Sequence, residues 1–494
     1  MNQPLPMRHP AMPPQGPHAI ARPDTAPASR ALRLGLGLLA VAIGTLAACS
    51  TVPDYKPPKV EVPQAFKEAA LFQPANPDAA NVSDEWWRVF NDAVLNDLVD
   101  RLNKNSPSLQ SAAASVNLAQ AALASSRAAW FPAISLSTAS SRNSSVNTTP
   151  GGTSYNLQGS LASWELDLWN RAGAGVEASQ ARLQASQDTL AAARLSLQAT
   201  VAQSYFSARS AQAQQRLLEQ TVAAYEKSLQ LTRDRYSGGV TSSADVAQAE
   251  VQLKSAQLQL RENTISRAQL THAMATLLGV APASFTLAPA PSGDLPDPPI
   301  VPVQLPAHLI ERRPDIAAAE RQMAAANAQI GAARSAFFPT LSLAASAGYR
   351  GSDYASIVQS ANRFWSIGPT VALNLFSGGA QSAAVDSAQA TYEQTVANYR
   401  QTVLAALQEV EDNLATAWNL QAAIALQKQA VSSALKSLDV AQHQYKAGMV
   451  SYLNVASAQS AALSAQTNLL NLQSRHLAAT SQLLKNLAGR WQQP

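Results

Sequence analysis

The chain has 494 residues, of which 47% are apolar but only 6% aromatic, and much of the apolar share is alanine mixed with serine and glutamine. This length exceeds one ordinary hydrophobic core, and the composition is typical of long helices packed closely through small residues. The formal net charge of +4 nearly vanishes once the arginine-containing first 48 residues are set aside. No basic run with interleaved aromatic residues remains, which argues against a nucleic-acid partner.

Residues 1–48 are predicted to be a signal peptide. Arg30 and Arg33 precede an apolar run of about 15 residues, which is too short to span a bilayer comfortably but suits an export signal. The run ends in Leu-Ala-Ala and then Cys49, the only cysteine, which resembles a bacterial lipobox. We therefore predict Cys49 as the lipid (palmitate) attachment site, and Ser50 in place of Asp implies sorting to the outer membrane. The alternative is an inert cysteine after a short core helix.

The rest of the chain contains two copies of one unit. Ala129–Leu136 recurs 207 residues later as Ala336–Leu343, and Tyr236–Val240 recurs 209 residues later as Tyr445–Met449. Two residues are therefore inserted in the second copy between these landmarks. The predicted organisation is an N-terminal segment over 49–106, a first repeat over 107–280, a Pro-rich linker over 281–306, a second repeat over 307–488 and a C-terminal tail over 489–494.

Each repeat begins with a helix and two extended segments. The helix starts near Pro107 or Pro314, because proline is favoured at the first helical position, and runs for about 24 residues to a Phe-Pro pair. Its predicted strands are Ile134–Ser141 and Tyr155–Leu168 in the first repeat, and Leu341–Arg350 and Trp365–Leu375 in the second. The apolar alternation slips between Leu161 and Trp164, which predicts a bulge.

A very long helix follows in each repeat. In the second repeat an apolar residue recurs every seven positions, which favours coiled-coil packing. The row consists of Val396, Val403, Val410, Ala417, Ile424, Val431, Leu438 and Tyr445. The first-repeat stretch from about Val176 to Ser237 would be roughly 93 Å long as a helix, so it must project from any compact domain.

Glycines then reverse the chain, at Gly238-Gly239 in the first repeat and at Gly448 in the second. A final helix of about 38 residues ends near Leu278 or Leu487. The first and final helices together match the long helix in length. We therefore expect them to stack end to end along it, with strands at one end and the glycine turns at the other.

Four strands per chain cannot close a barrel, and unpaired backbone groups in lipid cost several kcal/mol each. Two chains would give eight strands with an interior filled by side chains, whereas three chains give twelve strands and a bore. If the strands enter a membrane, the expected assembly is therefore a trimer. The alternative is a periplasmic coiled-coil protein whose strands form a small capping sheet.

The sequence offers no catalytic constellation. The six histidines show no metal-ligand spacing, and no second cysteine supports a zinc site. Gly238-Gly239 and Gly378-Gly379 lack the lysine of a phosphate loop. We predict no enzyme activity, no cofactor and no metal site. Asp234 and Asp439, near the glycine turns, are candidates for a closed aperture, although a solvated helix face explains them equally well.

Several motifs of the chain are distinctive when taken together: Ser83–Phe90, the Phe-Pro pairs, Ser163–Trp169, Arg312–Ile316 and the two Tyr-x-x-Gly turns. In combination they resemble the outer-membrane factor family of TolC-like channels, in the lipoprotein branch paired with RND pumps. The resemblance implies a mainly α protein with a membrane β-barrel portion. Tandem-duplicated, long antiparallel helices would form a periplasmic α-barrel, and four strands per chain would contribute to a twelve-stranded trimeric β-barrel. The segment 49–106 and the linker would be equatorial.

The predicted function is that of a passive exit duct for drugs or other small molecules, and hence a role in antibiotic resistance. The resemblance implies a lipid-anchored homotrimer in the outer membrane that extends into the periplasm, where it binds a periplasmic adaptor (membrane fusion protein) and an inner-membrane RND transporter. The glycine turns are the predicted docking tips, comprising Tyr236, Gly238, Gly239, Tyr445 and Gly448. Alternatives are a channel for type I secretion or metal efflux, and a non-conducting periplasmic scaffold.

The resemblance is incomplete at one place. Asn170-Arg171 stands where the family commonly has Phe or Gly beside the arginine, which leaves open how the second strand joins the long helix.

Overall fold

The computed structural model describes residues 51–68, 85–143, 152–288, 295–299, 301 and 312–488. Its helices are η3 Trp86–Phe90, α2 Ala93–Asn105, α3 Pro107–Ala128, α4 Arg171–Ser237, α5 Ser243–Leu277, η4 Pro282–Ser284, α7 Pro314–Arg334, η5 Ser335–Phe337, η6 Ser360–Asn362, α8 Ala380–Lys446 and α9 Tyr452–Leu487. Its strands are β1 Ile134–Asn143, β2 Gly152–Leu166, β3 Thr340–Gly351 and β4 Arg363–Ala372. The predicted signal peptide, Cys49 and the tail 489–494 lie outside the described residues.

The helices confirm the predicted repeat. α3 and α7 both start at their proline, and α4 and α8 each contain 67 residues. The offset between the halves is therefore 209 from the first residue of the long helices onward. The two inserted residues lie in the junction between β4 and α8, and both long helices keep the same length.

The junction before α4, which the sequence left open, is a left-handed turn. Asn170 has φ 58°, and Gly379 before α8 has φ 87°. The Asp167 carboxylate accepts hydrogen bonds from the backbone N–H groups of Ala172 and Gly173 at 3.1 and 2.8 Å. These bonds satisfy donors that a helix start leaves unpaired. Asn170 thus replaces a glycine without preventing the turn, because asparagine tolerates this conformation.

The four strands form one antiparallel sheet in the order β1-β2-β3-β4. The predicted bulge is confirmed, since the β2–β3 register shifts between Leu161 and Trp164. β4 ends at Ala372, so the prediction of a strand to Leu375 was too long at its end. Within the described chain, β1 and β4 each pair along one edge only.

The sheet has one apolar and one polar face. Leu161 of β2 pairs with Ile134 of β1 and Ala345 of β3, and Ala345 pairs in turn with Ile367 of β4. The next position in each strand forms a row of serines: Ser135, Ser160, Ser346 and Ser366. Successive side chains point to opposite faces of a strand, so the two rows lie on opposite sides of the sheet.

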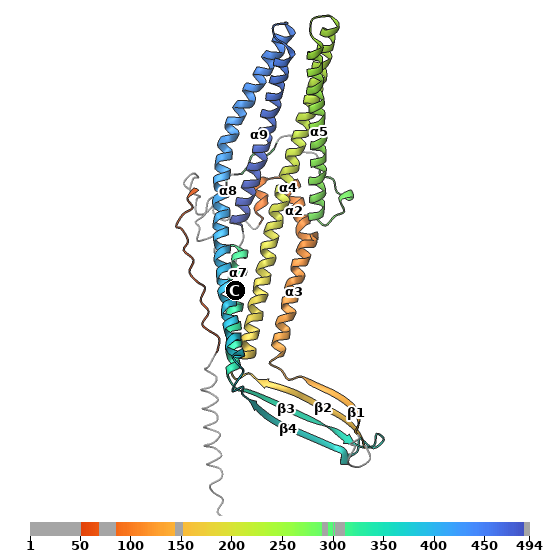
Figure 1. Ribbon diagram of the computed structural model, residues 1–494, viewed down its shortest axis with the longest axis vertical. Coiled ribbons are helices and arrows are strands. Elements are labelled where there is room, and N and C mark those ends of the chain that lie inside the picture. The colour runs from red at the N-terminus through yellow and green to blue at the C-terminus, as the bar shows by residue number, and fades with distance from the viewer. Residues whose placement is uncertain are drawn as a thin grey trace, which may run out of the picture. The chain divides into compact units, whose positions relative to one another are not determined.

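The helices are arranged along the two long ones, as expected (Figure 1). α3 and α5 pack in succession along α4, and α7 and α9 pack in succession along α8. α4 also contacts α7 and α9, which joins the two halves. The predicted heptad row of α8 faces these neighbours, because none of its eight members is exposed. The heptad row is therefore the packing face of α8, while its coiled-coil geometry stays a prediction.

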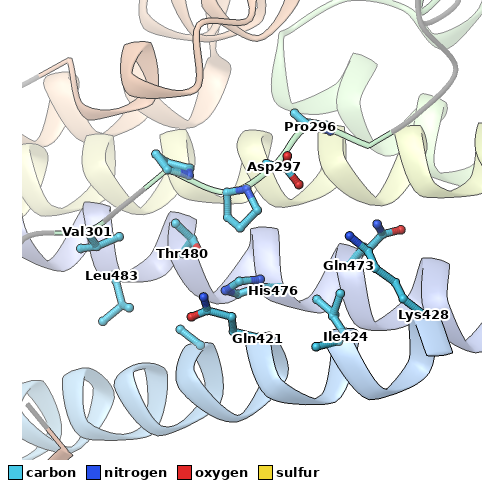
Figure 2. Close-up of a pocket in the computed structure, with 14 residues that line it drawn as sticks. Pro296, Asp297, Val301, Gln421, Ile424, Lys428, Gln473, His476, Thr480 and Leu483 are labelled. Carbon is cyan, nitrogen blue, oxygen red and sulfur yellow. The ribbon is translucent and has the colours of Figure 1, made fainter. Parts of the chain in front are cut away.

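The largest core cluster lies near the middle of the long helices. There η3, α2 and the middle of α4 pack together, with Phe90 and Phe206 rings 4.9 Å apart between centroids. The linker joins this region, since Arg209 donates a hydrogen bond to the Ala288 carbonyl at 2.6 Å. Farther along, linker residues 296–299 run beside α9 and, together with residues of α8 and α9, line a cavity of about 420 Å³ at His476 (Figure 2). Burial lowers the pKa of His476.

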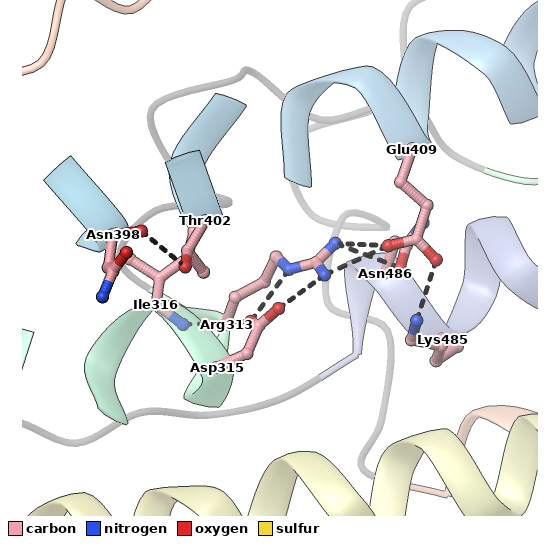
Figure 3. A network of polar contacts seen from close by, with 8 residues as sticks. All are labelled: Arg313, Asp315, Ile316, Asn398, Thr402, Glu409, Lys485 and Asn486. Carbon is pink, nitrogen blue, oxygen red and sulfur yellow. Dashed lines mark hydrogen bonds and ion pairs between the residues drawn. The ribbon is translucent and has the colours of Figure 1, made fainter. Parts of the chain in front are cut away.

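A polar network fixes the start of α7 against α8 and α9 (Figure 3). The buried Arg313 guanidinium binds the carboxylates of Asp315 at 2.8 Å and Glu409 at 3.1 Å. It also donates to the Asn486 side-chain oxygen at 3.2 Å, while Lys485 binds Glu409 at 2.9 Å. The predicted family motif around Arg313 is thus a clamp that joins three helices.

Candidate functional site

The two glycine turns have the same backbone conformation. Gly239 has φ 73° and Gly448 has φ 77°, both in the left-handed region that favours glycine. Each turn closes with a further hydrogen bond, from Val240 N to the Arg235 carbonyl at 2.8 Å and from Met449 N to the Gln444 carbonyl at 2.9 Å. These bonds satisfy the last carbonyls of α4 and α8. Both helices therefore end and reverse as the sequence predicted.

Contacts between the turns join the two halves. The Arg235 guanidinium lies over the Tyr445 ring at 4.9 Å, and its Nη1 donates to the Lys446 carbonyl at 3.0 Å. The Tyr445 hydroxyl donates to Thr232 Oγ1 at 3.3 Å, and its ring packs edge-on against Tyr452 at 5.5 Å. The α4 and α8 ends are thus held together by one cation–π contact and two hydrogen bonds.

A second link connects the starts of α5 and α9. Ser242 and Asp245 form a capping box at the start of α5. Burial would raise the pKa of the Asp245 carboxyl, but hydrogen bonds from Thr241 and Ser242 lower it overall. The Tyr452 backbone N–H, at the start of α9, lowers the pKa of Asp245 further. The Asp245 carboxylate therefore caps α5 and interacts electrostatically with the start of α9.

The predicted tip residues are only partly brought together. Tyr445 is 4% exposed, whereas Tyr236, its equivalent in the first repeat, is 51% exposed. Asp234 accepts a hydrogen bond from Gln230 at 2.8 Å, and Asp439 lies 3.5 Å from His443, so each aspartate interacts along its own helix. In the described part of the chain, the two aspartates do not contact each other. Their aperture role stays a prediction.

Arg235 was missed by sequence reasoning. The repeat itself contained a signal, because the position equivalent to Arg235 is Gln444, so an arginine directly precedes only one of the two repeated tyrosines.

The strand end of the molecule differs from the tips in its exposed surface. Aromatic side chains are exposed where helices meet strands, at Trp130, Phe131, Phe337 and Phe376. In the described part of the chain, no helix combines the length and apolar character needed to cross a bilayer. Nor do the described histidine and acidic side chains gather into a group of three that could hold a metal ion.

Comparison with known proteins identifies the family. The family model for outer membrane efflux proteins matches residues 98–280 and 305–490. A probable efflux pump outer membrane protein of Pseudomonas putida, TtgC, is 32% identical over 92% of this chain and 95% of its own length. The cation efflux system protein CusC of Escherichia coli is 30% identical over 91% of this chain and 97% of its own. The chain therefore belongs to the outer membrane efflux protein family.

The fold agrees with this assignment. The solved structure of the outer-membrane channel OprN superposes with a TM-score of 0.81 at 27% identity, and the match covers 90% of this chain and all of that one. Mainly helical architecture with a small sheet is thus common to this chain and a solved outer-membrane channel. The family is one of outer-membrane efflux proteins and not of enzymes.

Proposed function

We propose that three copies of this chain form the passive exit duct of a tripartite RND-type efflux system and conduct drugs or other small molecules across the outer membrane. The observation that carries this proposal is the two-faced sheet, with apolar residues on one side, serines on the other and two edges that no other described strand pairs. An apolar outer face and a polar lumen are what a water-filled barrel requires. Free edges in lipid require partner strands, which further copies supply.

Planar bilayers test conduction directly. Purified protein is expected to give single-channel conductance, and light scattering corrected for bound detergent is expected to give a trimer. A non-conducting scaffold would give no channels, and a conducting monomer or dimer would contradict the strand count.

A matched pair of variants tests the two faces. Ala345→Lys places a charge on the apolar face, which costs about 2–4 kcal/mol near the middle of a bilayer, so we expect less protein assembled in the outer membrane. Ser346→Lys, one residue along, places the same charge in the lumen, so we expect normal assembly and a shift of selectivity toward anions. Equal assembly of both variants would show that the faces are wrongly assigned.

Metal efflux is the second candidate, because CusC, a cation efflux system protein, is among the relatives. Export assays with a panel of metal-cation salts and with organic drugs in the same host distinguish the two substrate classes.

Cys49 is proposed to carry a lipid. The place of Thr51, two residues later in the sequence, supports this, because its hydroxyl lies within hydrogen-bonding distance of the carbonyls of Trp169 at 3.1 Å and Gly331 at 3.0 Å. Trp169 follows β2 closely, so the described chain begins near the strand end of the helices. Mass spectrometry of membrane-extracted protein should show an acylated N-terminal cysteine, and an unmodified thiol would contradict the assignment.

The glycine turns are proposed to dock the periplasmic adaptor. A β-branched residue in a left-handed conformation costs about 1–2 kcal/mol, which should misshape a turn without unfolding the subunit. Changing Gly239→Val together with Gly448→Val should therefore preserve trimers but lower export and cross-linking to the adaptor. Gly368→Val is a control, because that glycine needs no left-handed conformation and a Cβ there meets no atom within 4 Å. Normal export and cross-linking by the double variant would refute the docking role.

A further inference from the structure

A cavity of about 390 Å³ lies where the end of α9 meets the start of α7, beside α4. Its polar wall includes Lys485 and Asn486, which belong to the network in Figure 3. Its apolar wall includes Ala192 and Leu195 of α4 and Pro314 of α7. A cavity of this size with apolar walls and a few polar groups is typical of sites that bind small organic molecules.

The Arg313 guanidinium also lines the cavity, but its donors are all in use. A guanidinium has five N–H groups. Nε and Nη2 donate to the two carboxylate oxygens of Asp315 at 3.0 and 2.8 Å. Nη1 and Nη2 both donate to Glu409 Oε2 at 3.1 Å, and Nη1 also donates to Asn486 Oδ1 at 3.2 Å. Arg313 therefore stabilises the clamp and neutralises Asp315, and it offers no further donor to a ligand.

Asn486, by contrast, has amide donors that are not in use. The residue is 2% exposed. Because a guanidinium can only donate, the contact with Arg313 shows which end of the Asn486 amide is the oxygen. The amide nitrogen, Nδ2, has no hydrogen-bond partner in the part of the chain that the structure describes. Since a buried donor without an acceptor lowers stability, an acceptor is expected beside Nδ2.

Lys485, the preceding residue, also has donors left over. Its side chain is 17% exposed, and within the described chain its ammonium makes one hydrogen bond, to Glu409 Oε1 at 2.9 Å. An ammonium has three N–H groups, so two remain for other acceptors. The polar wall of the cavity thus has an excess of donors, from one cation and one uncharged amide.

The first repeat shows that the joint between the two helices does not itself require these donors. There, Gly279, just after α5, lies against Pro107, the first residue of α3. The residue equivalent to Asn486 in that joint is Leu277, at the offset of 209. The same joint is therefore made once with an apolar side chain and once with an amide. The donors of the second repeat serve something other than holding the helices end to end.

We propose that this cavity binds a small organic anion with one carboxylate group. The carboxylate oxygens accept hydrogen bonds from Lys485 and Asn486, and the apolar part of the ligand lies against Ala192 and Leu195. Hydrogen bonds between an ammonium and a carboxylate are stronger than those between neutral groups. The two cations and two carboxylates of the clamp cancel in charge, so a singly charged ligand is favoured over a divalent one. All these residues belong to one chain, so the site depends neither on the trimer nor on conduction.

Isothermal titration calorimetry of the purified full-length protein in detergent, with sodium benzoate as the probe, tests the site. Asn486→Asp keeps the oxygen that Arg313 binds but replaces the amide donors by a like charge. We therefore expect benzoate to bind this variant at least ten-fold more weakly than the parent. Asn486→Leu introduces the residue of the first repeat, removes the donors without adding charge and should weaken binding as well. The control Asn454→Asp makes the same charge change at an exposed position near the other end of α9 and should bind benzoate like the parent.

Two further probes define the ligand class. Benzamide has nearly the shape of benzoate but no charge, and sulfate has charge but no apolar part, so both should bind more weakly than benzoate. Benzoate should also raise the thermal unfolding midpoint of the parent, and raise it less in both Asn486 variants. Equal binding of benzoate to the parent and to folded Asn486 variants would overturn the site. Tighter binding of benzamide or sulfate would overturn the ligand class, and no heat of binding with the parent at millimolar benzoate would overturn the proposal.

Discussion

Helices α3 and α7 occupy equivalent places in the repeat, yet their surroundings differ. Both begin at a proline and are rich in alanine, but α7 buries residues around most of its circumference whereas α3 buries only Leu109 and Leu123. The cause is position, because α7 packs on both α4 and α8 while α3 packs on α4 and only briefly on α2. Burial in this chain is therefore set by the neighbours of a helix and not by its own apolar pattern.

One position illustrates the difference well. Ala325 of α7 is 3% exposed, while its equivalent in α3, Leu118, is 73% exposed. The larger apolar side chain is the one left in water. Exposure at this position is therefore set by the neighbours of the helix and not by the apolar character of the residue.

The starts of the two helices differ as well. Arg313 precedes α7 and binds two carboxylates, whereas its equivalent before α3 is Ser106. The Ser106 hydroxyl is buried and has no hydrogen-bond partner among the described residues. Only the second repeat has an ionic clamp at this point.

The largest effect should come from removing the clamp. Arg313→Ala leaves Asp315 without its cation and Glu409 with Lys485 alone. Because both carboxylates are partly exposed, we expect a loss of about 3 kcal/mol, at the low end of the cost of breaking a buried ion pair. Ser106→Ala should be almost neutral, because the lost hydroxyl makes no bond. Guanidinium unfolding followed by circular dichroism in detergent measures both variants. Equal unfolding midpoints would contradict the assigned role of Arg313.

A smaller effect is expected in the middle of the two helices. Met323 of α7 is fully buried, and Met323→Ala should lower the free energy of unfolding by about 2–3 kcal/mol through lost burial and a cavity. Its equivalent Val116 is only partly buried, so Val116→Ala should cost about 1 kcal/mol or less. The same unfolding measurement compares them. A larger loss for Val116→Ala would mean that α3 is as tightly enclosed as α7.

The smallest effect concerns pH. Burial would raise the pKa of Asp315 and of Glu409, but Arg313 lowers that of Asp315, and Lys485 with Arg313 lowers that of Glu409. Carboxylates with a lowered folded-state pKa stabilise the fold above about pH 4.5 and lose that contribution as the pH falls through the lowered values. Because Asp315 and Glu409 are partly exposed, this pH-dependent contribution to stability is small. The difference in unfolding midpoint between the parent and Arg313→Ala should therefore be smaller at pH 3 than at pH 7. An equal difference at both pH values would contradict the linkage between these pKa values and stability.

The sequence predicted the repeating parts of the fold well. The heptad row from Val396 to Tyr445, the prolines before α3 and α7 and the slip at Leu161 each arise from local spacing, so each could be found by inspection. The predicted positions of the strand ends were less accurate, because nothing in the local sequence distinguishes Ala372, where β4 ends, from the exposed residues that follow it.

The clamp around Arg313 and the contacts of Arg235 with Tyr445 at the glycine turns could not be predicted in the same way. Arg313 binds Glu409, which lies 96 residues away, and Asn486, which lies 173 away. No periodicity relates residues so distant in sequence. Tyr236 and Tyr445 have the same motif but opposite exposure, because the difference arises from which half has a neighbour within the chain.

The place of the two inserted residues limits how such a chain can change in length. Each residue added inside an α-helix turns everything beyond it by about 100°, so two would rotate a long helix by more than half a turn and move its heptad row away from its partners. Between β4 and α8 the same two residues are taken up by Ser377, Gly378 and Gly379. For protein engineering, this junction is therefore the position at which a short tag can be introduced while both 67-residue helices keep their phase.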